Sequence, residues 1–240
     1  MLSRIVPFGS VALYLATSCR RTYNGMSALW ILKTGLVAIL QIIVHDATMQ
    51  KKKVVLASSS PRRRELLEAA GVLFVIDPAN IPEDMTAKLP AKDLVQKLAL
   101  EKAQAVALRY PDAIVIGADT VVSIGKFNWS KPENEKEARM MLGKLSGKTH
   151  HVWTGFAIID TKKGKSLTRA VSSAVTLLPF TKKEIDRQVK TGEALEGAGG
   201  YMIQKGGAAL IKKIDGDYTN IIGLPLAAVL SELKKMGVRS

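Results

Sequence analysis

The sequence has few of the residues from which disulfides and zinc centres are built. Cys19 is the single cysteine among 240 residues, which excludes an intramolecular disulfide framework and a cysteine-built metal site. The three histidines, His45, His150 and His151, are too few to favour a histidine-rich zinc centre. This composition favours a protein of a reducing compartment.

Aromatic residues and negative charge are also scarce. Aromatic residues make up 5% of the chain, which is little for the base-stacking platforms of nucleic-acid binders. Lysine and arginine number 35 against 21 acidic residues, so the net charge is +14. Such a charge suits a nucleic-acid or membrane surface, or a small polyanionic substrate. Lysines recur as scattered pairs such as Lys162–Lys163 and Lys234–Lys235, which favours the small substrate.

No apolar run has the length of a membrane-spanning helix. The longest, residues 27–44, is interrupted by Lys33 and Gln41, and its uninterrupted part is shorter than the ~20 residues required. It also lies too far from Met1 for a secretory signal. The stretch "MQKKKVVLASSS" resembles a natural start, so we expect translation to begin at Met49. We therefore predict an extension at 1–48, with a weak anchor or targeting segment as the alternative, and one domain at 49–240.

The domain shows apolar runs that alternate with helical patterns, which indicates an α/β fold. We expect strands at 53–57, 113–118, 151–159, 166–177 and 208–214, and helices at 61–70, 91–109, 133–145, 181–190 and 223–236. Thr181 and Glu184 predict a capping box. Pro61 and Pro132 are placed where a first helical turn accepts proline.

Three arginines stand at the start of an expected helix in "LASSSPRRRELL", residues 56–67. This end of a helix carries partial positive charge and prefers acidic residues. Successive helical side chains point about 100° apart, so Arg62, Arg63 and Arg64 cannot all face one ligand. We expect Arg62 and Arg63 to join the free N–H groups and the hydroxyls of Ser58–Ser60 in a phosphate site. A solvated arginine cluster is the alternative.

Two further charges lie on apolar patterns. Lys102 falls on the apolar stripe of "LVQKLALEKAQAVAL", where it needs an anion unless its stem extends to water. Asp119 lies inside "AIVIGADTVV", a run typical of a strand buried on both faces. A carboxylate in that strand needs a cation, strong donors or a catalytic task.

Three weaker candidates lie in loops. Glu83 occurs in "NIPED", Lys131 in "SKP", and Gln204 in the glycine-dense "EGAGGYMIQKGG", where its amide could contact a base edge. Together with the residues above, the basic groups would neutralise a polyphosphate, while Glu83 and Asp119 could hold a divalent ion. These are the requirements of nucleoside triphosphate hydrolysis. The site is not of the Walker type, because no G-x-x-x-x-G-K-[ST] motif occurs.

These motifs resemble the Maf family of nucleoside triphosphate pyrophosphatases from about residue 53 to 237. The matching stretches, in family order, are "LASSSPRRRELL", "EKA", "GADTVV", "KP", "LSGKTHHVWTG", "AGGYMIQ" and "GDYTNIIGLPL". The resemblance implies a mixed, twisted sheet flanked by helices of the Maf/inosine-triphosphatase-like type, usually in a cytoplasmic homodimer. It also implies cleavage between the α and β phosphates with a divalent metal (Mg²⁺, Mn²⁺ or Co²⁺).

The resemblance also implies roles for individual residues. Asp119 matches the proton acceptor. The phosphate-contacting segment is matched by Ser58, Arg62 and Arg63, and further polar pocket positions by Glu83, Lys102 and Lys131.

The substrate branch depends on Arg62, Thr120 and Gln204, which resemble the dTTP/UTP-hydrolysing branch. Thr120 and Gln204 could pair with a pyrimidine carbonyl and N–H. Gly197, where many relatives have a basic residue, and Trp129 depart from the family pattern. Two alternatives stay open: the same chemistry on 7-methylguanosine or other modified triphosphates, and a basic nucleic-acid-binding or cell-division regulatory protein.

Overall fold

The computed structural model describes residues 52–84 and 88–238. The strands are β1 (Lys53–Leu56), β2 (Val75–Ile76), β3 (Ala113–Ile124), β4 (Phe127–Trp129), β5 (Thr149–Asp160), β6 (Lys165–Leu177) and β7 (Ile211–Asp215). The α-helices are α3 (Pro61–Ala69), α4 (Ala91–Ala107), α5 (Glu135–Leu145), α6 (Lys182–Lys190), α7 (Tyr218–Ile222) and α8 (Leu226–Lys235). Short 3₁₀ turns occupy Glu193–Leu195, Ala198–Gly200 and Gly206–Leu210. The expected extension at 1–48 and the start at Met49 lie outside the described residues and stay predictions.

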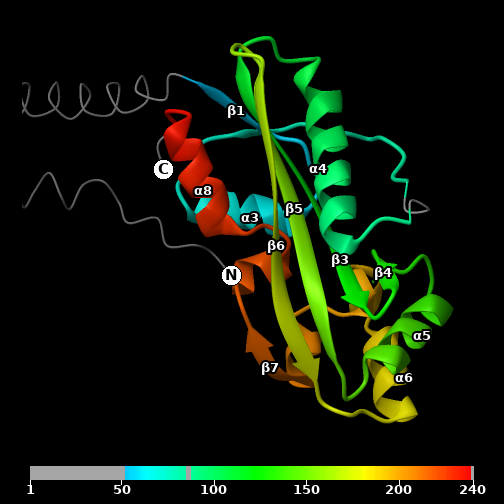
Figure 1. Ribbon diagram of the computed structural model, residues 1–240. Helices are drawn as coiled ribbons and strands as arrows, with labels where there is room; N and C mark the ends of the chain where they lie inside the picture. Colours follow the sequence, from blue (N-terminus) through cyan, green and yellow to red (C-terminus); the bar gives the residue numbers. More distant parts are fainter. Residues whose placement is uncertain (1–51, 85–87, 239–240) are drawn as a thin grey trace, which may run out of the picture. The chain divides into compact units, whose positions relative to one another are not determined.

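The strands form one mixed sheet in the order β2-β1-β3-β5-β6-β7, with β4 added on β3. β1 is parallel to both β2 and β3, whereas the pairs from β3 to β7 are antiparallel. The three longest strands, β3, β5 and β6, are neighbours in the sheet (Figure 1). The predicted mixed α/β sheet flanked by helices is confirmed.

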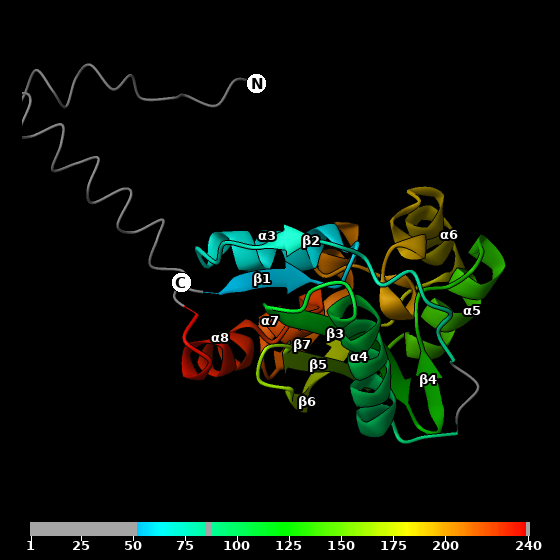
Figure 2. The ribbon, with the colours of Figure 1, turned by 90° about the horizontal axis from the view of Figure 1, so that it is seen from above.

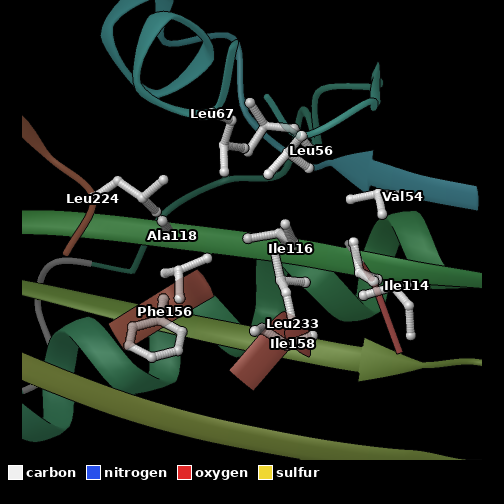
Figure 3. Packing of buried hydrophobic residues seen from close by; sticks show 13 residues of the cluster. Val54, Leu56, Leu67, Ile114, Ile116, Ala118, Phe156, Ile158, Leu224 and Leu233 are labelled. Atoms are coloured by element: carbon white, nitrogen blue, oxygen red, sulfur yellow. The ribbon is translucent and has the colours of Figure 1, made fainter. Parts of the chain in front are cut away.

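The two faces of the sheet are covered by different helices. Ile116 of β3 packs with Leu67 of α3 and Leu233 of α8 in one apolar cluster (Figure 3). Its neighbour Val115 packs with Ala103 of α4 in another cluster. Successive side chains of a strand point to opposite faces of the sheet. Because both faces are covered here, the first residues of β3 are apolar throughout. Figures 1 and 2 both show α5 and α6 together at the end of the sheet where β4 lies.

Two glycines let α4 lie directly on the sheet. A Cβ atom on Gly117 of β3 would lie 2.2 Å from the carbonyl oxygen of Ala99 in α4. A Cβ atom on Gly155 of β5 would lie 2.2 Å from the carbonyl oxygen of Val95. Neither distance is compatible with a side chain, so the close approach of α4 depends on both glycines.

Most elements were predicted, and the differences have local causes. The capping box of Thr181 and Glu184 and the first-turn position of Pro61 are confirmed. The placement of Pro132 in a first helical turn is wrong. α5 begins at Glu135, because the Asn134 side chain caps it by accepting from the N–H of Glu137.

The expected elements near the C-terminus also needed correction. β7 begins at Ile211 rather than 208, since the chain before it forms a 3₁₀ turn. The helix expected from 223 begins at Leu226, after Gly223 with φ of 125° and Pro225. The short elements β2, β4 and α7 were missed. Within residues 52–84 and 88–238, the helices are too short or too polar to cross a membrane.

Candidate active site

A cavity of about 720 Å³ lies beside an uncovered stretch of β3. β1 ends at Leu56, which pairs with Ile116, and β4 pairs with β3 only from Val122 onward. Asp119 and Thr120 lie between these two pairings. Consecutive strand residues point to opposite faces, yet both line the cavity. The cavity therefore extends around this edge of β3.

The structure brings all the residues singled out from the sequence to this cavity. Some of them lie in regular elements, namely α4 and β3. The others come from the β1–α3 junction, from the loop that follows β2, from the loop that precedes α5, and from the glycine-rich segment. The nine candidates, all of which line the cavity together with other residues, are Ser58, Arg62, Arg63, Glu83, Lys102, Asp119, Thr120, Lys131 and Gln204.

Arg63 is held by three hydrogen bonds in three directions. Its Nε donates to the carbonyl of Gly223 at 2.8 Å, its Nη1 to Ser58 Oγ at 3.0 Å, and its Nη2 to Thr120 Oγ1 at 3.1 Å. Burial lowers the pKa of Arg63, and the nearby Asp119 carboxylate opposes this shift. These bonds use three of the five guanidinium N–H donors, so the group is both fixed and able to bind a ligand.

Arg62 joins α3 to the glycine-rich segment. Its Nη1 lies 2.8 Å from Met202 Sδ, and its Nη2 donates to the carbonyl of Glu196 at 2.8 Å. Burial lowers the pKa of Arg62, while the Glu196 carboxylate raises it. Arg64 is exposed and lies 3.7 Å from Glu68, as expected for the outward member of the arginine cluster.

Lys102 is shared by two carboxylates at the other side of the cavity. Its Nζ donates to Asp119 Oδ1 at 2.6 Å and lies 2.8 Å from Glu83 Oε1. The side chains of Lys102 and Asp119 are 12% and 7% exposed. The inward lysine therefore has protein anions as partners, and its stem does not extend to water. Burial raises the pKa of Asp119, and the charges of Lys102 and Arg63 offset part of this effect.

The carboxylates of the cavity indicate which kind of metal ion could bind there. The described part of the chain contains no group of three or more His, Cys, Asp or Glu side chains that could hold an ion. Asp119 and Glu83 nevertheless contact the same ammonium and line the same cavity. Mg²⁺-like cations often take only one or two protein carboxylates and complete their shell with substrate phosphates and water. The pair fits a cation of that kind, and does not fit a resident zinc.

Sequence reasoning missed three polar residues around the cavity. Glu196 Oε2 lies 3.3 Å from Lys131 Nζ, both in the cavity wall. Thr154 and Asn220 are fully buried behind Thr120. The sequence signal for Thr154 and Asn220 was weak, a polar side chain within an apolar pattern, as in "VWTGFAIID" and "TNIIGLPL".

Comparison with known proteins places this geometry in a family. The profile of the family described as "Maf-like protein" matches residues 53–236. A protein of Syntrophus aciditrophicus named dTTP/UTP pyrophosphatase is 46% identical over 189 residues, which cover 79% of this chain and 92% of the relative. A protein of the same name from Dictyoglomus thermophilum is 45% identical over 188 residues, covering 78% and 97%.

A solved structure shows a looser likeness. The Ham1 protein of Staphylococcus aureus matches with a TM-score of 0.41 and 11% identity, over 75% of this chain and 100% of that chain. A likeness at this score carries no argument about function. The sequence matches show the family, because the profile extends from β1 to the last turn of α8 and includes every residue of the cavity wall named above. The chain belongs to the Maf family.

Proposed function

We propose that this protein is a nucleoside triphosphate pyrophosphatase that hydrolyses the α–β phosphate bond of dTTP and UTP. The products are the nucleoside monophosphate and pyrophosphate. The observation that carries the proposal is the convergence of basic side chains on the buried Asp119 in a cavity of small-molecule size. The names of the relatives at 45% and 46% identity support the choice of substrate.

The phosphates would bind at the β1–α3 junction. Ser58 Oγ accepts from Arg63 Nη1 at 3.0 Å and from the N–H of Ser60 at 3.2 Å. Its hydroxyl hydrogen is therefore left to donate to a phosphate oxygen. Arg62, Arg63 and Lys131 would neutralise the triphosphate and the leaving pyrophosphate, aided by the free N–H groups at the start of α3.

Asp119 would act as the general base. It takes a proton from a water molecule whose oxygen forms a bond to the α phosphorus, while the bond to the bridging oxygen of the β phosphate breaks. Burial raises the pKa of Asp119 above its usual value, which makes this carboxylate a stronger base. Lys102 holds the carboxylate in place through its 2.6 Å hydrogen bond.

A divalent cation would be held by Glu83 and Asp119 and, when bound, would supply charge neutralisation at the phosphate oxygens. Mg²⁺, Mn²⁺ and Co²⁺ are the cations we propose. Thr120 and Gln204 would contact the pyrimidine base. A base that leaves buried polar groups unpaired is strongly rejected, so this contact can supply selectivity.

The test is a pyrophosphate-release assay on the full chain with each cation and a panel of triphosphates. The panel contains dTTP, UTP, CTP, GTP and 7-methylguanosine triphosphate. We expect highest kcat/KM for dTTP and UTP, with monophosphate and pyrophosphate as products. Absence of activity with every nucleotide and cation would contradict the enzymatic proposal, and preference for 7-methylguanosine triphosphate would contradict the substrate.

We further propose a cytoplasmic homodimer that forms no stable nucleic-acid complex and that, without the extension at 1–48, does not use a membrane. Sedimentation of the purified chain would measure the oligomeric state, and a mass of one chain would contradict the dimer. Turnover of dTTP without binding to duplex or single-stranded DNA at physiological salt would separate the enzyme from a regulator that uses its basic surface.

A further inference from the structure

A continuous line of hydrogen bonds runs from the cavity into the sheet. Arg63 Nη2 donates to Thr120 Oγ1 at 3.1 Å, and Thr120 Oγ1 lies 2.9 Å from Thr154 Oγ1. Thr154 Oγ1 in turn donates to the backbone carbonyl of Asn220 at 2.8 Å. Thr120 and Thr154 are cross-strand partners of β3 and β5, so the register of the sheet places the two hydroxyls together.

The chemistry of the groups determines the direction of each bond. Thr154 is fully buried and has a single hydroxyl hydrogen, which it gives to a carbonyl that can only accept. The opposite arrangement would leave two fully buried oxygens 2.8 Å apart with no hydrogen between them. Thr120 must therefore donate to Thr154. Because Arg63 can only donate, it occupies one lone pair of Thr120.

The inner end of this line is rigid. Asn220 is fully buried in α7, and its Nδ2 donates to the carbonyl of Val152 at 3.0 Å and to Ser173 Oγ at 2.9 Å. Its carbonyl also accepts from the N–H of Gly223 at 3.0 Å. The carbonyl that orders the two threonines is thus fixed by side-chain and backbone bonds.

These bonds leave Thr120 one lone pair and no hydrogen for a ligand. The side chain is only partly buried and lines the cavity, so this lone pair is what a ligand meets. We propose that Thr154 is a positioning residue that makes Thr120 an obligatory hydrogen-bond acceptor for the nucleobase. The inference rests on the proposed function and deepens it.

An obligatory acceptor distinguishes pyrimidines by their ring nitrogen. Uracil and thymine carry an N3–H donor, which would satisfy Thr120. Neutral cytosine has a lone pair at N3, and this lone pair would face the lone pair of Thr120. Two acceptors that face each other without a donor cost about 1–3 kcal/mol, which corresponds to a discrimination of roughly 5- to 150-fold.

Thr154→Val tests the proposal, because valine keeps the shape and removes the hydroxyl. The hydroxyl hydrogen of Thr120 then has no Thr154 oxygen to which it can donate. It can turn toward the cavity and donate to N3 of cytosine. We expect the ratio of kcat/KM for UTP over CTP to fall about tenfold or more. Thr154→Ser restores the hydroxyl and should restore most of the ratio. If Thr154 served only folding, the variant would change kcat/KM for UTP and for CTP by the same factor.

Thr149→Val is the matched control. Thr149 lies on the same strand β5, and its hydroxyl lies 2.8 Å from that of Thr176 across the strand pair, at an exposed position outside the cavity wall. This variant should keep the wild-type ratio of UTP over CTP.

The outcomes separate the two proposals. If wild-type protein hydrolyses no triphosphate, the proposed function fails and this inference fails with it. If it hydrolyses UTP, but folded Thr154→Val keeps the wild-type ratio, only the inference is overturned. Wild-type protein alone provides a second measurement that needs no variant. We expect it to reject 3-methyluridine triphosphate, which lacks the N3–H donor, and turnover equal to that of UTP would overturn the inference.

Discussion

Lys102 of α4 donates a 2.6 Å hydrogen bond to Asp119 of β3, and this contact joins the helix layer to the centre of the cavity. The approach of α4 over Gly117 makes the contact possible, since Lys102 follows Ala99 by three residues and Asp119 follows Gly117 by two. The close packing of α4 on the sheet thus positions the carboxylate that we propose as the general base. Burial raises the pKa of Asp119 despite the lysine, so the ionised carboxylate is held at a cost to folding.

Asp119→Asn should therefore remove activity without lowering stability. Loss of the general base is expected to reduce kcat by about 10²- to 10⁴-fold, while nucleotide binding persists. Because the folded-state pKa is raised, the neutral amide removes an unfavourable buried charge, while Lys102 keeps Glu83 as its anionic partner at 2.8 Å. The free energy of unfolding at pH 7 should therefore stay equal or rise. Turnover, nucleotide binding and denaturant unfolding would be measured. Near-normal turnover would contradict the role of Asp119.

Asp160→Asn is the matched control. Asp160 also forms a buried 2.6 Å pair with a lysine, Lys52, but it does not line the cavity. Burial raises the pKa of Asp160, and hydrogen bonds from Lys52 and from the N–H of Lys163 lower it by more. The ionised form is thus stabilising, present above the unfolded pKa and lost as pH falls through the folded one. This variant should lose stability at pH 7 and keep kcat, opposite to Asp119→Asn.

Arg63→Lys should reduce kcat/KM by roughly 10- to 100-fold, although the positive charge is retained. The three bonds of Arg63 point to Ser58, Thr120 and Gly223, and a lysine cannot reproduce this planar fork. Hydrogen bonds from charged donors contribute about 1.5–3 kcal/mol each, so the expected reduction corresponds to the net loss of one such bond. Arg64→Lys is the control, because Arg64 is exposed and faces Glu68. Equal kinetics of the two variants would show that charge alone matters at position 63.

The sequence was sufficient to select four charged residues of the cavity, because each of them departed from a local rule. Lys102 interrupts an apolar helical stripe, Asp119 interrupts an apolar strand, and Arg62 and Arg63 occupy a helix start that disfavours them. Such departures are visible without a structure.

The sequence was not sufficient to assign partners. The anion expected for Lys102 was a phosphate, whereas the structure pairs it with Asp119 and Glu83. That pairing depends on how closely α4 approaches β3, which is a tertiary property. Thr154 was not recognised because a threonine in a strand is ordinary, and only the register of β3 and β5 reveals its contact.

Gly117→Ala should destabilise the fold by more than about 1–3 kcal/mol, the usual cost of overpacking. The added Cβ would lie 2.2 Å from the Ala99 carbonyl oxygen and 2.8 Å from the Ala103 nitrogen, both backbone atoms that cannot turn away. Gly143→Ala is the control within α5, where the added Cβ meets nothing within 4 Å. It should stabilise the helix by about 0.5–1 kcal/mol. Denaturant unfolding of both variants measures the difference, and equal effects would contradict the packing argument.

His150→Gln should remove part of the acid sensitivity of folding. Burial, and secondarily the charge of His151, lowers the pKa of His150 from 6.5 to about 4. Its Nε2 lies 2.7 Å from the Tyr201 hydroxyl, while its buried Nδ1 has no hydrogen-bond partner among the described residues, so a second proton would be buried unpaired. As the pH falls, the unfolded state binds this proton first, because the pKa of His150 is higher in the unfolded state than in the folded state. Stability is therefore full above pH 6.5 and declines toward pH 4, by about 3 kcal/mol in total.

Denaturant unfolding at pH 7.5 and pH 4.5 would measure this slope in three proteins. Wild type should lose stability between the two values, and His150→Gln should lose less over the same window, even if its stability at pH 7.5 is lower because of lost packing. His151→Gln is the control: that histidine is exposed, and the neutral imidazole of His150 remains buried. The slope should therefore persist in His151→Gln. A wild-type slope in His150→Gln would mean that other groups, rather than this imidazole, make the fold sensitive to acid.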